Sequence, residues 1–417
     1  MKNKIIAFDF LRALAIIMII PAHLSNFLYS TYSKLGLYAF DPYFANMGLG
    51  LFIFMSGYLL YYNNHSINSF QNILSFYKKR LLRIFPLYWA ALGVFILVFS
   101  VFAPKLNSGF IFPNAQNAFD ISNVLVHILG LQILLAPAYA SPLLTLYFIG
   151  LIIIFYAIYP FIIMISKDEK SLLFVSSMVF LGFLFLSMTF NIIDPRFFVF
   201  FPIFVFGILT CKQSLIEKSE TIAKKPFFQV LLAALPIIFV LIVVLQSRTV
   251  LFLDPKVSLS IDSAGSGTIG SSMIISMLSS VGNLLDMNYN ILKFLIDTVL
   301  LIIFTLIFCI LEYRFAMKFI DNKFPSSLSS LFTYIGTSSY CIYLFHRPFL
   351  ALWNAGTNFI GNPILRDIIV LFIALPILLI LCYHLQMFEL NLKKYFSHEK
   401  TPGKDLSFKR SITGSNK

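Results

Sequence analysis

Three ionisable side chains lie inside the first long apolar run of the sequence, which extends from Ile5 to Leu28. They are Asp9, Arg12 and His23. A run of about 20 mostly apolar residues is typical of a helix that crosses a membrane. An ionisable group near the centre of a bilayer costs roughly 2.5–3.5 kcal/mol or more, so such groups are candidates for a functional site. Together these side chains could bind an anion and transfer a proton.

The spacing of these residues predicts that they share one face of the helix. Arg12 and His23 are eleven residues apart, which corresponds to ~16 Å along the axis. Pro21 removes the donor that would bond the Ile17 carbonyl, and we expect a kink just before His23. The face suits a substrate with an anionic group at one membrane surface and a reacting group further in. The simpler interpretation is an ion pair between Asp9 and Arg12 that fixes helix packing, with His23 bonded to a backbone carbonyl.

A group of cations precedes the third apolar segment, and its members are Lys78, Lys79, Arg80 and Arg83. Arg80 and Arg83 are three residues apart and therefore share a helix face. Arginine side chains match phosphate oxygens with paired hydrogen bonds, so a phosphate site completed by Arg12 is one interpretation. The other is that these cations bind anionic lipid headgroups or set the orientation of the chain.

Two further polar residues lie in apolar segments. Ser56 follows Gly48 and Gly50 in a segment whose small residues would allow close helix packing, and it could bond a substrate or His23. His346 lies at the outer end of a late segment, so we expect both histidines near the outer membrane surface. The simpler interpretation is a histidine at the membrane interface whose hydrogen bonds are all made. The sequence has no glycine-rich phosphate loop, His-Glu-x-x-His or Gly-x-Ser-x-Gly motif. These residues alone do not distinguish an enzyme from a transporter.

The composition is that of a membrane protein. Of the 417 residues, 59% are hydrophobic and 12% are charged, and the mean hydropathy is +0.86; soluble domains are about 45–50% apolar and about 25% charged. The net charge of +13 does not indicate nucleic-acid binding, because the basic residues lie in short loops and in the tail. The four cysteines form no Cys-x-x-Cys pair, so neither a disulfide nor a metal site is indicated. The first apolar run is too long and too polar in places for a cleavable signal peptide.

We predict an all-α, polytopic integral membrane protein with about ten transmembrane helices and both termini in the cytoplasm. Most of the 31 Lys and Arg residues then fall on the cytoplasmic side, as the positive-inside rule requires. We expect residues 1–390 to form the transmembrane domain and residues 391–417 to form a basic, disordered cytoplasmic tail. The predicted spans are residues 5–28, 44–62, 83–103, 143–165, 171–190, 196–211, 227–246, 292–312, 330–350 and 363–388.

Segment 121–136 is apolar but short, and we interpret it as interfacial or re-entrant. Counted as a span, it would put the lysines of segment 212–226 outside the cell and weaken the charge asymmetry. Two outer segments are long, 104–142 and 247–291. They could bind an acceptor or act as a lid, and a plain connection is an equally good interpretation.

The motifs occur in an order that resembles the acyltransferase-3 family of integral-membrane acyltransferases, and the similarity covers nearly all of the span region. The first span has an arginine and a histidine separated by ten residues, and the second ends in Ser-Gly-aromatic-Leu. The third has Arg-x-x-Arg and Ile-x-Pro-x-Tyr, and a late span has Ser-Tyr-x-x-Tyr-Leu-x-His-x-Pro. The residues that carry these motifs are Arg12 and His23; Ser56, Gly57, Tyr58 and Leu59; Arg80, Arg83, Ile84, Pro86 and Tyr88; and Ser339, Tyr340, Tyr343, Leu344, His346 and Pro348.

The resemblance implies ten spans, acyl-CoA as the donor substrate and a hydroxyl group, usually on a sugar of a cell-surface glycan, as the acceptor. It implies that Arg12, Arg80 and Arg83 hold the CoA phosphates from the cytoplasmic side and that His23 is the base. The stretch 147–159 lacks the glutamate of one large branch and is more similar to the branch that acylates surface polysaccharides. No appended esterase-like domain is visible in the sequence.

The sequence therefore predicts a membrane O-acyltransferase, expected to be an O-acetyltransferase of the cell envelope and a multi-pass protein of the cell membrane. His23 would take the proton from the acceptor hydroxyl as its oxygen attacks the thioester. An imidazole titrates near neutral pH, which suits this role. Asp9 could orient Arg12. The side chains that could polarise the thioester carbonyl are His346, Ser56 and Tyr88.

The expected partners are acyl-CoA, a saccharide or glycolipid acceptor and membrane lipids. We expect no nucleic acid and no tightly bound cofactor, with acetyl-CoA or another acyl-CoA acting as a substrate. The alternative is an exporter or flippase for a polysaccharide or glycolipid, in which the polar face is a permeation path and the cations bind a lipid pyrophosphate. The sequence shows no inverted repeats or paired broken helices, which counts against this alternative. A passive scaffold or receptor would leave the ionisable residues of the first span without a purpose.

Overall fold

The computed structural model describes residues 2–24, 41–102, 120–143, 145–212, 289–317, 325–357 and 359–398. These residues form helices and connecting turns, and none of them lies in a strand. Six of the described helices are long and apolar enough to cross a membrane. The prediction of an all-α integral membrane protein is therefore confirmed.

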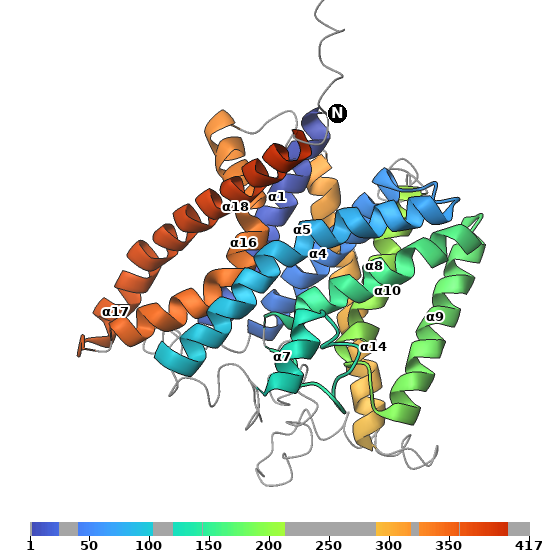
Figure 1. Ribbon diagram of the computed structural model, residues 1–417, viewed down its shortest axis with the longest axis horizontal. Helices are drawn as coiled ribbons and strands as arrows, with labels where there is room; N and C mark the ends of the chain where they lie inside the picture. Colours follow the sequence, from blue (N-terminus) through green and yellow to red (C-terminus); the bar gives the residue numbers. More distant parts are fainter. Residues whose placement is uncertain are drawn as a thin grey trace, which may run out of the picture.

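Nine of the predicted spans coincide with described helices (Figure 1), and the seventh, 227–246, lies outside the described residues. Most of the two long outer segments, 104–119 and 247–288, also lies outside them. The elements in chain order are α1 (Lys2–Ile19), α2 (Pro21–Leu24), α4 (Asp41–Asn63), α5 (Phe70–Leu97), the π-helical turn η2 (Val98–Phe102), α7 (Ile121–Ile128), α8 (Tyr147–Ile165), α9 (Glu169–Phe190), α10 (Arg196–Lys212), α14 (Tyr289–Phe315), α16 (Ser326–Gly356), α17 (Pro363–Ile369), the π-helical turn η5 (Val370–Ala374) and α18 (Leu375–His398).

The two ends of the described chain lie on one side of the molecule. The start of α1 and the end of α18 both lie toward the top of Figure 1. An even number of membrane crossings requires such an arrangement. The count of ten spans and the cytoplasmic location of both termini remain predictions, which rest on the distribution of Lys and Arg.

The centre of the molecule is formed by α1, α4, α10 and α16, whose backbones approach one another at glycines. A Cβ atom on Gly57 of α4 would lie 2.2 Å from the carbonyl oxygen of Phe204. A Cβ atom on Gly207 of α10 would lie 2.2 Å from the carbonyl oxygen of Phe54. In a membrane, where apolar burial gives helices no reason to associate, close contact of this kind holds them together. The prediction that small residues of the second span serve packing is confirmed.

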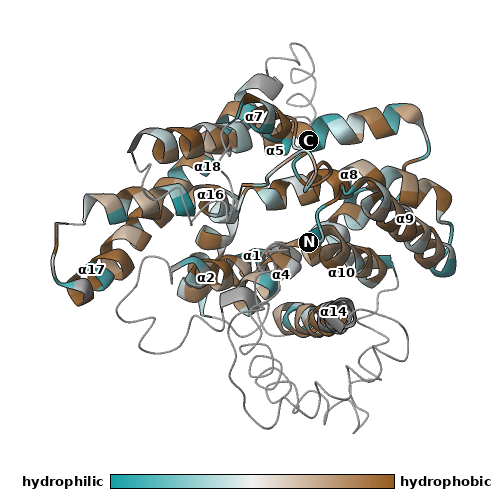
Figure 2. Ribbon diagram, turned by 90° about the horizontal axis from the view of Figure 1, so that it is seen from below, coloured by the Kyte–Doolittle hydropathy of each residue, from teal (hydrophilic) through white to brown (hydrophobic). Residues whose placement is uncertain are grey.

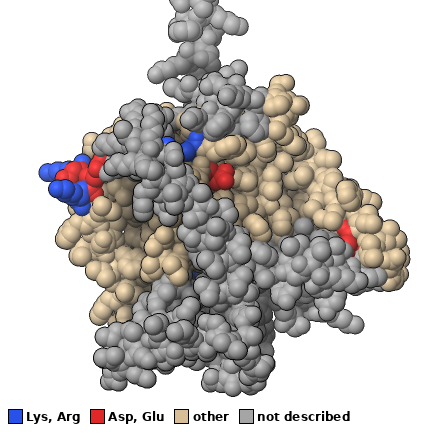
Figure 3. Space-filling model, turned by 180° about the vertical axis from the view of Figure 1, so that it is seen from behind, with Lys and Arg blue, Asp and Glu red and all other residues tan. Residues whose placement is uncertain are grey.

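The helices at the two ends of the molecule expose large apolar side chains. Phe174, Phe185 and Met188 are exposed on α9, and Phe372 and Phe388 are exposed on η5 and α18. Figure 2 shows α9 and α17 at opposite ends of the molecule, with hydrophobic residues along both. In Figure 3 the described surface carries charged atoms in only a few places, most of them in its upper part. These surfaces suit contact with lipid chains rather than with water.

Helix α18 continues to His398, so the expectation of disorder is wrong for residues 391–398, while the division of the chain after residue 390 stays a prediction. The first eight residues of the predicted disordered tail, 391–398, are helical. Glu389 supports this last part of the helix, because its carboxylate pairs with Lys393 one turn later and accepts a 2.8 Å hydrogen bond from Gln386 Nε2. Pairs of opposite charge four residues apart stabilise a helix. Residues 399–417 lie outside the described residues.

Segment 121–136 begins with a helix that is too short to cross a membrane, as the interfacial or re-entrant interpretation requires. Helix α7 has eight residues, which correspond to a length of ~12 Å, and turns follow it up to α8. His127 holds the segment together, because its Nδ1 donates to the carbonyl of Asn123 at 2.8 Å and its Nε2 accepts from the backbone N–H of Leu143 at 3.0 Å. Burial lowers the pKa of His127 to about 4, so this ring is neutral at physiological pH.

We expect acid to destabilise the protein through His127. Its pKa in the folded state, about 4, lies below the unfolded value of about 6.5, so the unfolded chain binds more protons between these two pH values. The stability that depends on the neutral ring is complete above about pH 6.5 and is lost as the pH falls toward about 4.

The substitution His127→Gln provides the measurement. Glutamine can donate to Asn123 and accept from Leu143, but it does not titrate. Melting temperatures of the detergent-purified protein should therefore depend less on pH below about 6.5 in the variant than in the wild type. An equal dependence in both proteins would show that other groups cause the acid sensitivity.

Candidate functional site

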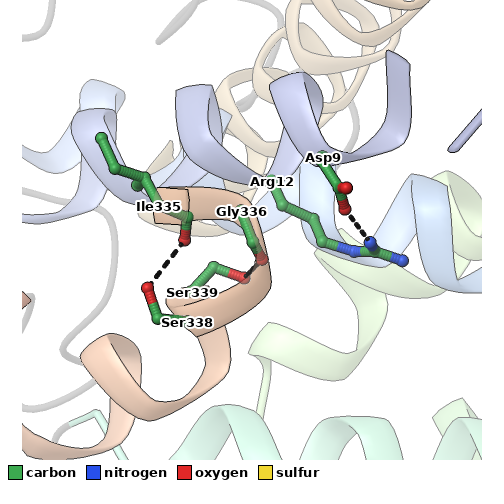
Figure 4. Close-up of polar contacts among 6 residues, drawn as sticks. All are labelled: Asp9, Arg12, Ile335, Gly336, Ser338 and Ser339. Carbon is green, nitrogen blue, oxygen red and sulfur yellow. Dashed lines mark hydrogen bonds and ion pairs between the residues drawn. The ribbon is translucent and has the colours of Figure 1, made fainter. Parts of the chain in front are cut away.

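An ion pair lies where α1 passes α16. Arg12 Nη1 donates to Asp9 Oδ1 at 2.7 Å, and the Asp9 side chain is nearly buried. The backbone of Asp9 lies against Gly336, where an added Cβ atom would be 2.2 Å from the Asp9 carbonyl oxygen. Figure 4 shows the pair beside the turn of α16 that contains Ser338 and Ser339, whose hydroxyls donate to carbonyls of their own helix. The predicted ion pair is therefore present, and α16 fixes the position of its backbone.

Three arginines gather at this place. Arg80 stacks on Tyr156 of α8, with its Cζ atom 5.5 Å from the centre of the ring. Arg12 lies within electrostatic range of both Arg83 and Tyr156, and Arg80 lies within range of Arg83. Ser56 Oγ donates to the Tyr156 hydroxyl at 3.3 Å. We call Arg12, Arg80 and Arg83 the arginine cluster, and Tyr156 lies near the first two of them.

The arginine cluster carries an excess of positive charge. Within the described ranges, Asp9 is the one carboxylate that forms an ion pair with the cluster, through Arg12. Three positive charges therefore face one negative charge. Arg12 is partly buried, with 26% of its side chain exposed, whereas Arg83 is exposed. An anion that contacts all three arginines would relieve their mutual repulsion. The cluster can therefore bind a phosphate or a similar anion with both buried and exposed donors.

Two of the predicted supporting residues have different surroundings in the structure from those that the sequence suggested. Ser56 lies beside the arginine cluster through Tyr156. Tyr88 is fully buried and donates its hydroxyl proton to the carbonyl of His127 at 2.7 Å, and Gln132 Nε2 donates to its oxygen. Its proton is thus used to anchor α7, so in this structure Tyr88 has no donor left for a thioester carbonyl.

The two predicted histidines are in contact. Helix α1 ends at Ile19, and Pro21 begins the short helix α2 that carries His23, so the expected break before His23 is confirmed. The rings of His23 and His346 stack with their centres 5.2 Å apart and their planes 17° apart. His346 is fully buried in α16. The sequence predicted both histidines near one membrane surface but did not predict that their rings touch.

Arg347 joins this pair, and sequence reasoning missed it. Its Nη2 lies 2.8 Å from Nδ1 of His23, and only 9% of the residue is exposed. Tyr343 and Tyr147 lie within electrostatic range of its charge. A cation next to a candidate histidine in an apolar segment was the signal that could have found it. We call His23, His346 and Arg347 the histidine site.

The hydrogen bonds of the histidine site determine where each ring carries its proton. A guanidinium group only donates, so Nδ1 of His23 accepts from Arg347 and the neutral ring has its proton on Nε2. Nδ1 of His346 lies 2.8 Å from the carbonyl oxygen of Tyr343, which only accepts, so this nitrogen carries the proton. Nε2 of His346 is therefore an acceptor; it is buried and makes no hydrogen bond within the described part of the chain. The site thus combines one ring that can donate from Nε2 with one ring that can accept at Nε2.

Aromatic and charged contacts surround the histidine site. The Tyr343 hydroxyl donates to the carbonyl of Thr145 at 2.6 Å. Arg196 lies over the Tyr147 ring at 4.1 Å and forms a 2.9 Å ion pair with Asp194. These contacts connect α16 with the starts of α8 and α10, and they fix the tyrosines that lie near Arg347.

Comparison with known families gives one match. A family model described as an acyltransferase domain matches residues 5–386, which include both the arginine cluster and the histidine site. A search of curated proteins and a search of solved structures found no match.

Gly336→Ala should destabilise the protein. The new methyl group would overlap the backbone of Asp9, and overpacking of this kind typically costs about 1–3 kcal/mol. The measurement is the melting temperature of the detergent-purified variant. Gly182→Ala on α9 is the matched control, because nothing lies within 4 Å of a Cβ atom there. An equal effect of the two substitutions on the melting temperature would show that the contact between α1 and α16 does not limit the stability of the protein.

Proposed function

The chain belongs to the acyltransferase-3 family, and from this premise we propose that it transfers an acyl group, expected to be acetyl, from acyl-CoA to a hydroxyl group of a cell-surface or lipid-linked saccharide. The observation that carries the proposal is the gathering of Arg12, Arg80 and Arg83, together with a histidine pair beyond the far end of α1. One group suits the anionic end of acyl-CoA, and the other suits the chemistry of its thioester.

The arginine cluster is the proposed binding site for the CoA phosphates. Guanidinium groups form paired, charge-assisted hydrogen bonds with phosphate oxygens. Arg83 is exposed and can meet the phosphates first, while Arg12 and Arg80 are partly buried and can hold them. Asp9 orients Arg12 by accepting from its Nη1 at 2.7 Å. The positive-inside rule puts this end of the molecule at the cytoplasm, where acyl-CoA is available.

The histidine site is the proposed place of acyl transfer. His23 follows Arg12 by eleven residues, a number over which an unbroken helix rises ~16 Å. The flexible arm of CoA between its phosphates and its sulfur is long enough for such a separation. A thioester carbonyl and an acceptor hydroxyl that meet here would find a ring N–H donor and a ring nitrogen acceptor. General-base removal of the hydroxyl proton would then promote attack on the acyl carbon.

Binding of acetyl-CoA tests the donor site. We expect Arg80→Gln and Arg83→Gln to weaken the binding of acetyl-CoA by the detergent-purified protein at least about tenfold each, because each loses a charge-assisted hydrogen bond to phosphate. Lys170→Gln is the matched control, since it removes an exposed cation at the start of α9, away from the cluster. Isothermal titration calorimetry gives the dissociation constants.

Two outcomes would contradict this assignment. Unchanged affinity in both arginine variants would make the arginines lipid contacts. Absence of acetyl-CoA binding in folded wild-type protein would favour the exporter or flippase that the sequence left as the alternative.

A second prediction concerns transfer itself. His23→Ala should lower the transfer of acetyl groups to membrane saccharides at least about 100-fold, while the dissociation constant for acetyl-CoA stays within about twofold, since the phosphate contacts of the arginine cluster remain. Transfer of labelled acetyl from acetyl-CoA to the saccharide fraction of isolated membranes is the measurement. A fully active His23→Ala variant would exclude the histidine site as the place of transfer.

A further inference from the structure

The hydrogen bonds of the two stacked rings give the two histidines different chemistry. His23 accepts from Arg347 at Nδ1 and therefore carries its proton on Nε2. His346 donates from Nδ1 to the carbonyl of Tyr343, so its Nε2 has a lone pair. A neutral imidazole takes up a proton only at the nitrogen with the lone pair. The nitrogen of His346 is thus prepared to act as a base, and Nε2 of His23 is prepared to donate.

The position of His346 directs its Nε2 away from its own helix. Nδ1 lies 2.8 Å and 3.2 Å from the carbonyl oxygens of Tyr343 and Ile342, one turn earlier on α16. Nε2 is on the opposite side of the ring, is buried and makes no hydrogen bond to any residue that the structure describes. Leaving a buried acceptor without a donor is costly, and at a candidate active site it indicates that a ligand supplies the donor. The hydroxyl of an acceptor substrate is such a donor.

Arg347 makes His23 unsuitable as the base. Its guanidinium occupies the lone pair of Nδ1 at 2.8 Å. The contact instead polarises the ring so that its Nε2–H is a better donor.

From these contacts we infer that His346 is the general base of acyl transfer and that His23 donates a hydrogen bond to the thioester carbonyl oxygen. The inference rests on the proposed function, and it exchanges the roles that the sequence gives to the two histidines. The ring centres are 5.2 Å apart, so the two nitrogens can act on neighbouring atoms of one reacting pair. Arg347 is a positioning residue, because it acts through His23.

The reaction step balances without a further reactant. The oxygen of the acceptor hydroxyl bonds to the acyl carbon while its proton moves to Nε2 of His346. Negative charge develops on the carbonyl oxygen, which accepts a hydrogen bond from Nε2 of His23. The carbon–sulfur bond then breaks, the carbonyl re-forms, and the departing CoA thiolate takes the proton from His346. The products are the acylated acceptor and CoA with a free thiol.

Two glutamine substitutions separate these roles. His346→Gln keeps an amide that can donate to the Tyr343 carbonyl but removes the base, and we expect kcat/KM for acetyl transfer to fall by about 10²–10⁴-fold. His23→Gln keeps an N–H donor, and we expect a smaller loss. The assay follows labelled acetyl from acetyl-CoA into the glycolipid and polysaccharide fraction of membranes from cells that lack this protein. Acetyl-CoA binding should be unchanged in both variants.

The pH profile of kcat/KM decides between the histidines. Among the described residues, the titratable or charged groups that face His346 are His23, Tyr343 and Arg347. Tyrosine and arginine do not change charge near neutral pH, so a loss of activity on acidification reports one of the histidines. We expect this acid limb to persist in His23→Gln and to be absent from the residual activity of His346→Gln.

The opposite pattern, an acid limb lost in His23→Gln and kept in His346→Gln, would overturn the inference, and so would its persistence in both variants. If His346→Gln did not fold, the profile of His23→Gln alone would decide: a persisting acid limb supports the inference, and a lost one overturns it. Wild-type protein that neither binds acetyl-CoA nor transfers the label would contradict the proposed function and this inference with it. Wild-type activity with a contrary pH profile would contradict the inference alone.

Discussion

The backbone contact between α1 and α16 is the constraint on which the rest of the site depends. A side chain at Gly336 would collide with the carbonyl of Asp9, so the two helices can pack only backbone to backbone. These helices and the short α2 that continues α1 carry most of the ionisable residues of the site. At one end the contact fixes the ion pair of Asp9 and Arg12, and further along it brings His23 against His346. A small change in the packing of α1 on α16 would therefore alter both groups together.

Ionisable groups inside this bundle contact specific partners. Arg12 binds Asp9, and Arg347 binds His23. A charge in a medium of low polarity is tolerated when a partner and hydrogen bonds compensate for its lost hydration. The arginine cluster departs from this rule, because its positive charges exceed the carboxylate in contact with them within the described part of the chain. That imbalance is the physical reason to expect an anionic ligand at this end of the bundle.

The two groups of residues are arranged for different tasks. The arginine cluster combines side chains from α1 and α5 beside a tyrosine of α8, so a ligand there contacts three helices. The histidine site is built from α2 and α16, and its two residues on α16, His346 and Arg347, are buried. A substrate that is charged at one end and reactive at the other satisfies both. This separation also keeps the phosphates away from the apolar surroundings of the histidines, where an anion would be costly.

The sequence by itself determined the class of protein, nearly all described helices, the break at Pro21, the packing role of the small residues and the short apolar segment after α5. These features follow from local properties: the length of apolar runs, the missing N–H of proline and the size of glycine. It also predicted the i, i+3 pair of Asp9 and Arg12, which needs only helical geometry. Only the tertiary structure decided that Tyr156 lies beside the arginine cluster, that Tyr88 anchors α7, and that Arg347 sets the protonation of His23. Those contacts join residues far apart in the chain, and they depend on how each helix is rotated about its axis, which no local pattern fixes.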